Sequence, residues 1–539
     1  MKVGNHIIQF FYILMGVLAL LVFTCVFFIG NSMDYYQYNK INALLPNYVF
    51  LGVALVGFAF ICLLAWVFRR TCLTRRVNWA VNGVLAVLFL LLFFVNVYIA
   101  REIAFRFPWD IMVVTAGAKD LAKGNTLGYS VYFSMYTNNI PILYVLKEIY
   151  SKAAESGNPS YINEFVWIQV SCALISIGGF FSCLTVKKLT RRPVPTFIAF
   201  FLYLALPGIT PWKIAPYTDA YGIVFPVMCV YFYLCYREAQ RPISKYLSLA
   251  AALLVGMLGG LVKPSEYIVV IAILVVELTG WLAGDWKRWR YILAEVGLMA
   301  VLFLAKESCM EYMMEDMELE FNPEVEAGWQ NYFYMGLNEE NTGSYHAEDV
   351  AIFGEFQDSR KERNSVAFER ALGRMEERGL LGSLYFWLRK MAMVFNDGTF
   401  GWQSEVWIHE HYPPNLASNT GRMDLLRSIF WPDSLYSGRF NAFCQLAWIF
   451  CLLGIAGSCF CPGGQREKHA ILAVVFLGIF CYQLLFEARA RYLFVFLPVL
   501  IATSICGMWQ WVCRIHGWID KWKNEKRIED ERQDMKECA

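Results

Sequence analysis

Charged residues are scarce in this chain of 539 residues, where they make up 17% of the sequence. A soluble domain has about a quarter of its residues charged. Hydrophobic residues make up 58%, and the mean hydropathy is +0.41. This composition excludes an ordinary soluble domain. The net charge of +2 says nothing about partners until the charges are assigned to the two sides of a membrane.

Several motifs are also missing. The 16 cysteines include no CxxC pair and lie almost entirely within or beside apolar segments, which excludes a disulfide framework and a cysteine metal site. No GxxxxGK[ST] loop is present, and no GxGxxG follows a strand, so the known nucleotide-binding loops are absent. No repeat of 20–50 residues is evident either.

The sequence contains many long runs of apolar residues. Runs of roughly 18–24 residues are long enough to cross a bilayer as helices. The first lacks a small-residue cleavage site, which favours a retained helix over a signal peptide. We predict an all-α polytopic membrane protein, a bundle of about 12 transmembrane helices with interfacial helices and a mixed extracytoplasmic region. The helices are expected at 7–30, 47–68, 78–100, 163–185, 194–211, 219–236, 246–263, 266–283, 291–307, 439–459, 469–486 and 493–513.

The loops between these helices alternate in character, and every second loop is short and basic. By the positive-inside rule the basic loops face the cytoplasm, which places both termini there and the other loops outside. Their basic residues are Arg69, Arg70, Arg75 and Arg76; Lys187, Lys188, Arg191 and Arg192; Arg237, Arg241 and Lys245; Lys287, Arg288 and Arg290; and Arg466 and Lys468. We predict a multi-pass protein of the plasma membrane, bacterial in origin.

The chain divides at its apolar segments. Residues 1–77 supply two additional N-terminal helices, 78–307 a transmembrane core with its first outer loop at 101–162, 308–438 an extracytoplasmic region, 439–513 the last helices, and 514–539 a cytoplasmic tail. The apolar stretch 140–150 is too short to span and is expected to be an interfacial helix.

The long polar region argues against nucleic acid as a partner. Residues 306–438 carry 23 acidic and 11 basic side chains, a net formal charge of −12. An apolar stripe runs from 368 to 394, and Gly379 and Gly382 interrupt it. Glycine is a poor helix former, so one helix is expected to become two there.

Asp110 is the main candidate for chemistry. It follows Phe107-Pro108-Trp109 at the outer end of the third helix, where proline stops the helix and tryptophan suits the membrane interface. A partly desolvated carboxylate in such a place can act as a base on a substrate that arrives from water. The alternative is an ordinary solvated loop aspartate.

Polar side chains on other outer loops are further candidates. The stretch Tyr136-Thr137-Asn138-Asn139 suits a hydroxyl-rich ligand, although helix capping would explain one asparagine. Asp219, after Tyr217, is either functional or the cap of a helix. Lys263 lies on the outward side against the positive-inside trend, which indicates an anionic partner or an ammonium that reaches for lipid headgroups.

Two further stretches carry charge on the outer side. Arg489 and Arg491 lie between the last two helices, and arginine matches phosphate geometry, so we predict a phosphate site there. Asp397 lies in Asn396-Asp397-Gly398, a sequence typical of turns. His409 and His411 lack an identified third ligand, so no metal site is predicted from them.

Taken in order, these stretches resemble the GT-C superfamily of integral membrane glycosyltransferases. The resemblance is closest to the bacterial branch related to dolichyl-phosphate-mannose protein mannosyltransferases and the lipid A aminoarabinose transferase, and it covers about 80–540. The stretches that carry it are Asp110, 136–141, Tyr217-Thr218-Asp219, Lys263-Pro264, 335–337 leading to Asp349, 396–400 and 488–492. Some members have two adjacent acidic residues in the first loop. Here Ile111 follows Asp110, so no cofactor is predicted and a divalent cation is left open.

The resemblance implies an inverting transfer on the outer face of the membrane. Asp110 would take a proton from an acceptor hydroxyl, while Arg489, Arg491 and Lys263 would stabilise the departing phosphate of a polyprenyl-phosphate sugar. The implied substrate contacts are Tyr136, Asn138, Asn139, Tyr217, Asp219 and Asp397, and the implied partners are the donor, a glycan, lipid or protein acceptor, and membrane lipids. The alternatives are a transporter or flippase of lipid-linked sugars and a non-catalytic membrane scaffold.

Overall fold

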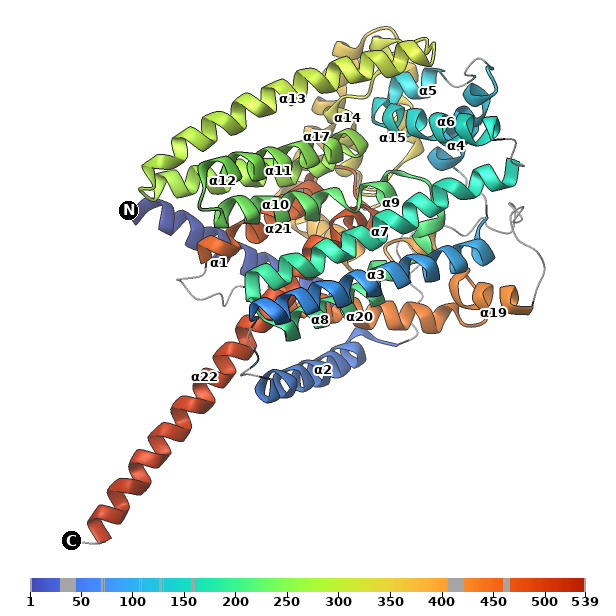
Figure 1. Ribbon diagram of the computed structural model, residues 1–539. Helices are drawn as coiled ribbons and strands as arrows, with labels where there is room; N and C mark the ends of the chain where they lie inside the picture. The colour runs from blue at the N-terminus through green and yellow to red at the C-terminus, as the bar shows by residue number, and fades with distance from the viewer. Residues whose placement is uncertain are drawn as a thin grey trace.

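The computed structural model is built of helices joined by turns and loops (Figure 1). It describes residues 2–29, 45–68, 71, 73–105, 107, 109–125, 128, 130–156, 160–405, 421–458 and 466–537, and these contain no β-strand. The helices are α1 (Lys2–Thr24), α2 (Asn47–Val67), α3 (Arg75–Ile103), α4 (Trp109–Ala122), α5 (Ser130–Met135), α6 (Ile140–Glu155), α7 (Ser160–Thr190), α8 (Pro193–Tyr203), α9 (Thr218–Gly222), α10 (Phe225–Glu238), α11 (Pro242–Val262), α12 (Tyr267–Leu282), α13 (Trp289–Asp316), α14 (Trp329–Gly336), α15 (Ala347–Val350), α16 (Ile352–Glu355), α17 (Arg360–Phe395), α18 (Trp402–Glu405), α19 (Gly421–Phe430), α20 (Ser437–Gly457), α21 (Arg466–Leu485) and α22 (Leu497–Glu537).

Helix α3 illustrates how the sequence specifies the bundle. Thr74 caps its first turn by accepting a hydrogen bond from the amide of Val77 at 3.3 Å. Residues at helical spacing along one face, from Val81 to Ile99, are buried, and α3 packs beside α7. The opposite face is apolar too and remains exposed. A helix that is apolar all round and exposed on one face is typical of a membrane span.

Ten of the twelve predicted segments are confirmed as helices long and apolar enough to cross a membrane, within the part of the chain that the structure describes. They are Val3–Phe28, Asn47–Val67, Arg75–Ile103, Phe165–Thr190, Thr218–Glu238, Pro242–Val262, Pro264–Leu282, Ser437–Gly457, Arg466–Leu485 and Ala490–Lys526. The chain is therefore an all-α polytopic membrane protein, as predicted. The segments 194–211 and 291–307 do not meet the same standard of length and composition.

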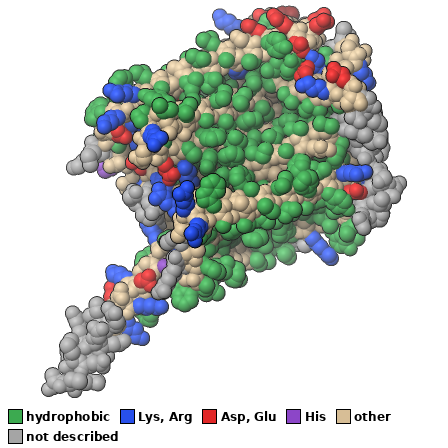
Figure 2. All heavy atoms as spheres, viewed as in Figure 1, with side chains coloured by type: hydrophobic (Ala, Val, Ile, Leu, Met, Phe, Trp, Pro, Cys, Tyr) green, Lys and Arg blue, Asp and Glu red, His purple; other side chains and the backbone are tan. Residues whose placement is uncertain are grey.

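The five basic loops meet at one end of the bundle. We call it the Arg75 end, after the first residue of α3, and we call the opposite end, where Asp110 follows α3, the Asp110 end. The contacts that join the loops are Arg192 Nη1 to the Thr71 carbonyl oxygen (3.0 Å), Lys188 Nζ to Glu238 Oε2 (2.9 Å), Arg237 Nη2 to Glu467 Oε1 (2.6 Å), and Arg288 to Glu467. Figure 2 shows basic side chains gathered where α22 leaves the body, beside a broad hydrophobic face.

The predicted segment 194–211 still runs from one end of the bundle to the other. It forms a shorter apolar helix, Pro193–Gly208, which ends in a π-helical stretch containing Pro207. Arg192, just before it, lies at the Arg75 end, and Tyr217, just after it, contacts Asp110. The α-helix is short because a π-helical stretch and then a 3-10 helix, Pro211–Ile214, follow it in the final part of the crossing.

The predicted segment 291–307 lies within α13, which also connects the two ends. This helix is long enough to span, but Arg290, Glu295 and Lys306 interrupt its apolar stretch. Arg288, which precedes it, pairs with Glu467 at the Arg75 end. Asp316, its last residue, pairs with Lys147 of α6 at the Asp110 end. The contacts thus agree with the twelve predicted segments, and α13 is visible along the top of Figure 1.

The region after α13 packs over the Asp110 end. The predicted break in the apolar stripe is confirmed: α17 is kinked at Gly379, whose φ of 64° and ψ of −177° are not helical. The amide of Ala327 donates to the Met135 carbonyl oxygen at 2.9 Å. The amide of Glu487 donates to the Tyr332 carbonyl oxygen, also at 2.9 Å. The described parts of this region are helices and loops.

The stretch 140–150, predicted as an interfacial helix, is helical and forms part of the 16-residue helix α6; its interfacial position stays a prediction. It packs against α4 and α7 through a buried face that includes Leu143 and Leu146. The C-terminal stretch is more helical than expected, because α22 continues to Glu537 and extends well beyond the bundle (Figure 1).

Candidate functional site

Asp110 lies in the first turn of α4, where a negative charge is favoured by the helix dipole. Trp109, just before it, has a φ of 60°, and this turn brings the carboxylate back against the bundle. The Tyr132 hydroxyl donates to Asp110 Oδ1 at 2.8 Å, and the Tyr217 hydroxyl lies 3.5 Å from Oδ2. The second contact is at the limit of a hydrogen bond, so Oδ2 is the oxygen better placed to accept a proton from another molecule.

Asn139 completes this group of polar side chains. Its side-chain amide donates to the Tyr132 hydroxyl at 2.8 Å, and the Tyr217 hydroxyl lies 3.1 Å from its Oδ1. Burial raises the pKa of both tyrosines well above the ordinary value, with a smaller contribution from the charge of Asp110. Both hydroxyls therefore remain protonated donors. The capping alternative for Asn139 is wrong, because its side chain makes no cap hydrogen bond.

Asp219 holds two cations at the same end of the bundle. Arg491 Nε lies 3.5 Å from Asp219 Oδ2, and the Lys263 ammonium contacts Oδ1. The helix-cap alternative for Asp219 is wrong, because Tyr217 occupies the cap position of α9 and Asp219 lies inside the helix. Lys263 does not reach for headgroups either, since its side chain is only 12% exposed. One carboxylate thus serves two positively charged groups.

Tyr217 joins the two clusters. The Arg491 guanidinium carbon lies 5.6 Å from the centre of the Tyr217 ring, and the hydroxyl of the same ring faces Asp110. Trp212 supports Arg491 from another direction at 5.8 Å. The carboxylate and the guanidinium are 381 positions apart in sequence, yet both lie against a single side chain.

Arg489 has a different neighbour from Arg491. Its Nε lies 3.8 Å from Glu487 Oε1, and Glu487 also accepts a hydrogen bond from the Tyr492 hydroxyl at 2.9 Å. The Lys263 ammonium lies 4.6 Å from the centre of the Tyr492 ring. Arg489 and Arg491 therefore pair with different carboxylates, Glu487 and Asp219. Tyr492 contacts both groups, through its hydrogen bond to Glu487 and through its ring beside Arg491.

Two predicted substrate contacts border these clusters. The Tyr136 ring lies 5.1 Å from that of Tyr132. Burial raises the pKa of the Tyr136 hydroxyl, and the charges of Asp110 and Glu487 raise it further. Asn138 donates to Asn139 Oδ1 at 3.2 Å and supports the polar group from behind.

Asp397 is part of a loop and not of the site. Its Oδ1 accepts from the amide and hydroxyl of Thr399 at 2.7 and 2.6 Å, and its Oδ2 accepts from the amide of Gly401 at 2.7 Å. The predicted substrate contact is therefore replaced by a structural role, because both oxygens are occupied by the loop. The loop still bears on the site, since Trp212 Nε1 donates to the Phe400 carbonyl oxygen at 3.1 Å.

Two residues near the site were not found from the sequence. Tyr132, the closest partner of Asp110, stands in a stretch with no distinctive pattern. Glu266 is 1% exposed, and neither of its carboxylate oxygens has a hydrogen-bond partner among the described residues. A side chain at Gly222 or Gly259 would collide with it. The position of Glu266 three residues after Lys263 is the one signal that the sequence offered.

Lys390 positions the segment that carries the two arginines. Its ammonium is fully buried and donates to three carbonyl oxygens, those of Gly336 (2.6 Å), Leu484 (3.1 Å) and Phe486 (2.7 Å). The region after α13 is thereby tied to the residues just before Glu487. No sequence pattern distinguishes this lysine from its neighbours on α17.

Within the described residues, one group of side chains is close enough to hold a metal ion, formed by Glu340, His346 and Glu348. It does not include Asp110, and both glutamates are exposed. Exposed acidic groups often lie this close without a metal. His409 and His411 fall outside the described residues.

The helices, their apolar outer face and the charged clusters at the two ends define a polytopic integral membrane protein. The chain belongs to the family described as conserved hypothetical integral membrane proteins, whose family model matches residues 1–510. The match covers all the predicted membrane segments except the last few residues of the final one. No curated protein and no solved structure matches the chain.

Proposed function

We propose that this protein is an inverting glycosyltransferase that moves a sugar from a polyprenyl-phosphate donor to an acceptor hydroxyl. The observation that carries the proposal is the position of Tyr217, which contacts the Asp110 carboxylate with its hydroxyl and the Arg491 guanidinium with its ring. The proposed base and the proposed phosphate-binding cation thus lie against the same side chain. Glycosyl transfer from a lipid phosphate requires such a pair.

In the proposed reaction, Asp110 Oδ2 takes the proton of the acceptor hydroxyl. The acceptor oxygen forms a bond to the anomeric carbon as the bond from that carbon to the phosphate oxygen breaks. The electron pair of the broken bond stays on the polyprenyl phosphate, and Arg491 and Lys263 stabilise its charge. General base catalysis of this kind is worth about 10²–10⁴-fold in rate, and preorganised cations stabilise developing charge in a low-dielectric site.

The remaining predicted residues have supporting parts in this proposal. Tyr132 and Tyr217 hold the Asp110 carboxylate in place through their hydroxyls. Asn139 and Tyr136 offer polar groups to the sugar or the acceptor. Arg489, which lies beside Glu487, adds a third positive charge for the departing phosphate.

We further propose that the Asp110 end faces the outside of a bacterial plasma membrane. The clustering of the five basic loops at the Arg75 end supports a cytoplasmic position for that end. Both termini would then lie in the cytoplasm. Because nucleotide sugars are absent outside, the donor must be an activated lipid, which agrees with the missing nucleotide-binding loops.

A transporter or flippase of lipid-linked sugars is the main alternative. Substrate sites of secondary transporters lie near the bilayer midplane, between repeats of the fold. The cluster around Asp110 instead lies where α3 ends and α4 begins. This position favours chemistry at the membrane surface over transport through its centre.

Mass spectrometry of surface glycans, in cells with and without the chain, tests the proposal. We expect one sugar substituent to disappear with the chain and to return when the chain is restored. Purified protein in vesicles should then transfer this sugar from its lipid phosphate to the acceptor. Movement of the donor across the vesicle bilayer without transfer would identify a flippase and overturn the proposal.

A further inference from the structure

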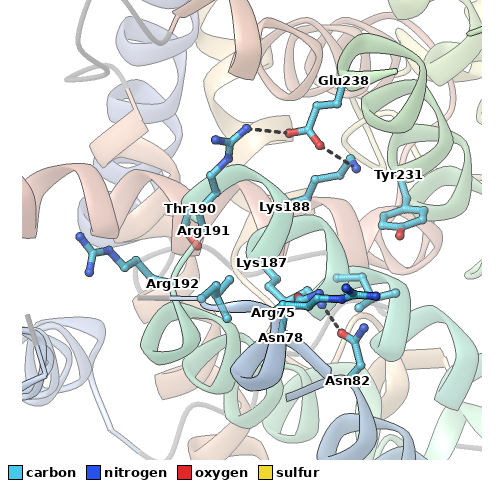
Figure 3. Close-up of a pocket in the computed structure, with 12 residues that line it drawn as sticks. Arg75, Asn78, Asn82, Lys187, Lys188, Thr190, Arg191, Arg192, Tyr231 and Glu238 are labelled. Carbon is cyan, nitrogen blue, oxygen red and sulfur yellow. Dashed lines mark hydrogen bonds and ion pairs between the residues drawn. The ribbon is translucent and has the colours of Figure 1, made fainter. Parts of the chain in front are cut away.

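A second charged site lies at the Arg75 end, far from Asp110. A cavity of about 740 Å³ opens there between α3, the end of α7 and α10 (Figure 3). The residues that line it are Leu73, Arg75, Asn78, Asn82, Leu184, Lys187, Lys188, Thr190, Arg191, Arg192, Tyr231 and Glu238. Five of these are cationic at neutral pH, and only Glu238 is acidic.

The single carboxylate of the cavity is shared among several cations. Lys188 Nζ lies 2.9 Å from Glu238 Oε2, and Arg191 Nη2 lies 3.5 Å from Oε1. Lys468, which stands just outside the cavity, approaches Oε1 at 3.6 Å. Figure 3 shows Lys188 and Arg191 both pointing at Glu238. One negative charge cannot neutralise this group.

Lys187 and Arg75 make no ion pair among the described residues. The Lys187 ammonium contacts the Asn82 side-chain oxygen, which is neutral (Figure 3). Arg75 is exposed in the first turn of α3 and has no hydrogen bond or ion pair among the described residues. Like charges held close together repel unless an anion lies between them. Among the described residues, the lining therefore carries more positive charge than Glu238 can balance.

The chemistry of the lining suits a phosphate group. Arginine donates two parallel hydrogen bonds to phosphate, and lysine adds a point charge. Asn78 and Asn82 stand one turn apart on α3 and add amide donors, so that neutral and charged donors surround the same space. A cavity of this volume holds a headgroup and not merely a single ion.

We propose that this cavity binds the phosphate headgroup of an anionic phospholipid. A free phosphate compound would share the same chemistry, and the surroundings of the cavity favour the lipid. The outer face of α3 beyond Asn82 is exposed and apolar, with Val84, Val87 and Leu91 at the surface. Acyl chains can lie along this face while the headgroup enters the cavity. Basic pockets between membrane helices bind anionic headgroups in this manner.

The proposal is tested with the full chain in bilayer nanodiscs that contain phosphatidylcholine with or without phosphatidylglycerol. Native mass spectrometry counts the lipids that the protein retains after release. We expect retention of phosphatidylglycerol over phosphatidylcholine, and we expect the double variant Arg75→Gln, Lys187→Gln to lose this preference by about tenfold. The proposal is independent of glycosyl transfer, because the readout is lipid retention.

A matched control removes the same charge from the same end without touching the cavity. The double variant Arg241→Gln, Arg290→Gln replaces two exposed residues outside the lining and should retain phosphatidylglycerol as the wild type does. The single variant Arg75→Gln, at an exposed position, keeps the test valid if the double variant fails to fold. Equal loss in the cavity and control variants would overturn the proposal.

A second arm separates the lipid from a free anion. Pyrophosphate is added to protein in phosphatidylcholine nanodiscs, and its binding is measured by calorimetry. Weak binding, with retention of phosphatidylglycerol, supports the lipid headgroup. Tight binding of pyrophosphate that depends on Arg75 and Lys187, without retention of the lipid, would assign the cavity to a soluble phosphate compound and overturn the lipid proposal.

Discussion

The two ends of the bundle hold charge in opposite ways. At the Asp110 end, cations are paired with carboxylates, and the buried Asp219 contacts both Lys263 and Arg491. At the Arg75 end, cations outnumber carboxylates, and Glu238 is one-third exposed. A balanced, buried cluster with one weakly bonded carboxylate oxygen suits proton and charge transfer. An open excess of cations suits binding an anion. The same residue types are thus arranged and buried differently at the two ends.

The largest expected effect comes from Asp110. Replacing Asp110 by asparagine removes the proposed base but keeps an acceptor for the Tyr132 hydroxyl, so we expect transfer to fall about 10²–10⁴-fold. Donor binding should persist, because the cations are untouched. Asp120→Asn, on the same helix, is the matched control and should keep full turnover. Retained turnover in the Asp110 variant would remove it as the base.

The second prediction compares the two carboxylates that hold cations. Asp219→Asn leaves Lys263 and Arg491 buried without their shared partner, which should cost about 3–5 kcal/mol of unfolding free energy. Glu238→Gln removes a partly exposed carboxylate and should cost less than about 1 kcal/mol. Thermal unfolding of both variants in the same detergent measures the difference. Similar losses would mean that the two ends are equally solvated.

The third prediction concerns Arg491 and phosphate. Alanine at this position should weaken donor binding about ten- to a hundredfold, and lysine should weaken it less, because it keeps the charge but loses the planar fork. Binding of a labelled polyprenyl-phosphate sugar is the measurement. Arg439→Ala, at an exposed position of α20, should bind normally. Equal affinity in all variants would exclude Arg491 from the donor site.

The smallest expected effect lies in the region that covers the Asp110 end. Gly379 has a backbone conformation that is almost restricted to glycine, so Gly379→Ala should cost about 1–3 kcal/mol of stability. Gly373→Ala, in a regular turn of α17 with open space around it, should gain about 0.5–1 kcal/mol. Chemical unfolding of the two variants provides the test. Equal changes would show that the kink is not set by its glycine.

Much of this architecture could be predicted from the sequence, because the local composition of a segment indicates whether it forms a membrane helix. Apolar length located the ten membrane-spanning helices, and charge located the loops that share the Arg75 end. The kink in α17 could also be predicted locally, because Gly379 interrupts an apolar helical stripe. A resemblance in the order of motifs added the expectation that Asp110 and Arg491 belong to one site.

Partners across the bundle could not be predicted, because helical periodicity gives the face of each helix but not its neighbour. The contacts of Asp110 with Tyr132 and of Asp219 with Arg491 depend on how distant helices pack. Asp397 shows the opposite error. Its turn-forming sequence was recognised, but the turn uses both of its oxygens and leaves none for a substrate.

The most direct test of the central claim is a cryo-electron microscopy structure of the protein with a non-hydrolysable polyprenyl-phosphate sugar. The account predicts that the phosphate lies within ion-pair distance of Arg491 and Lys263 and that the sugar faces Asp110. A phosphate bound instead in the cavity of Arg75 and Lys187, or a sugar turned away from Asp110, would contradict it.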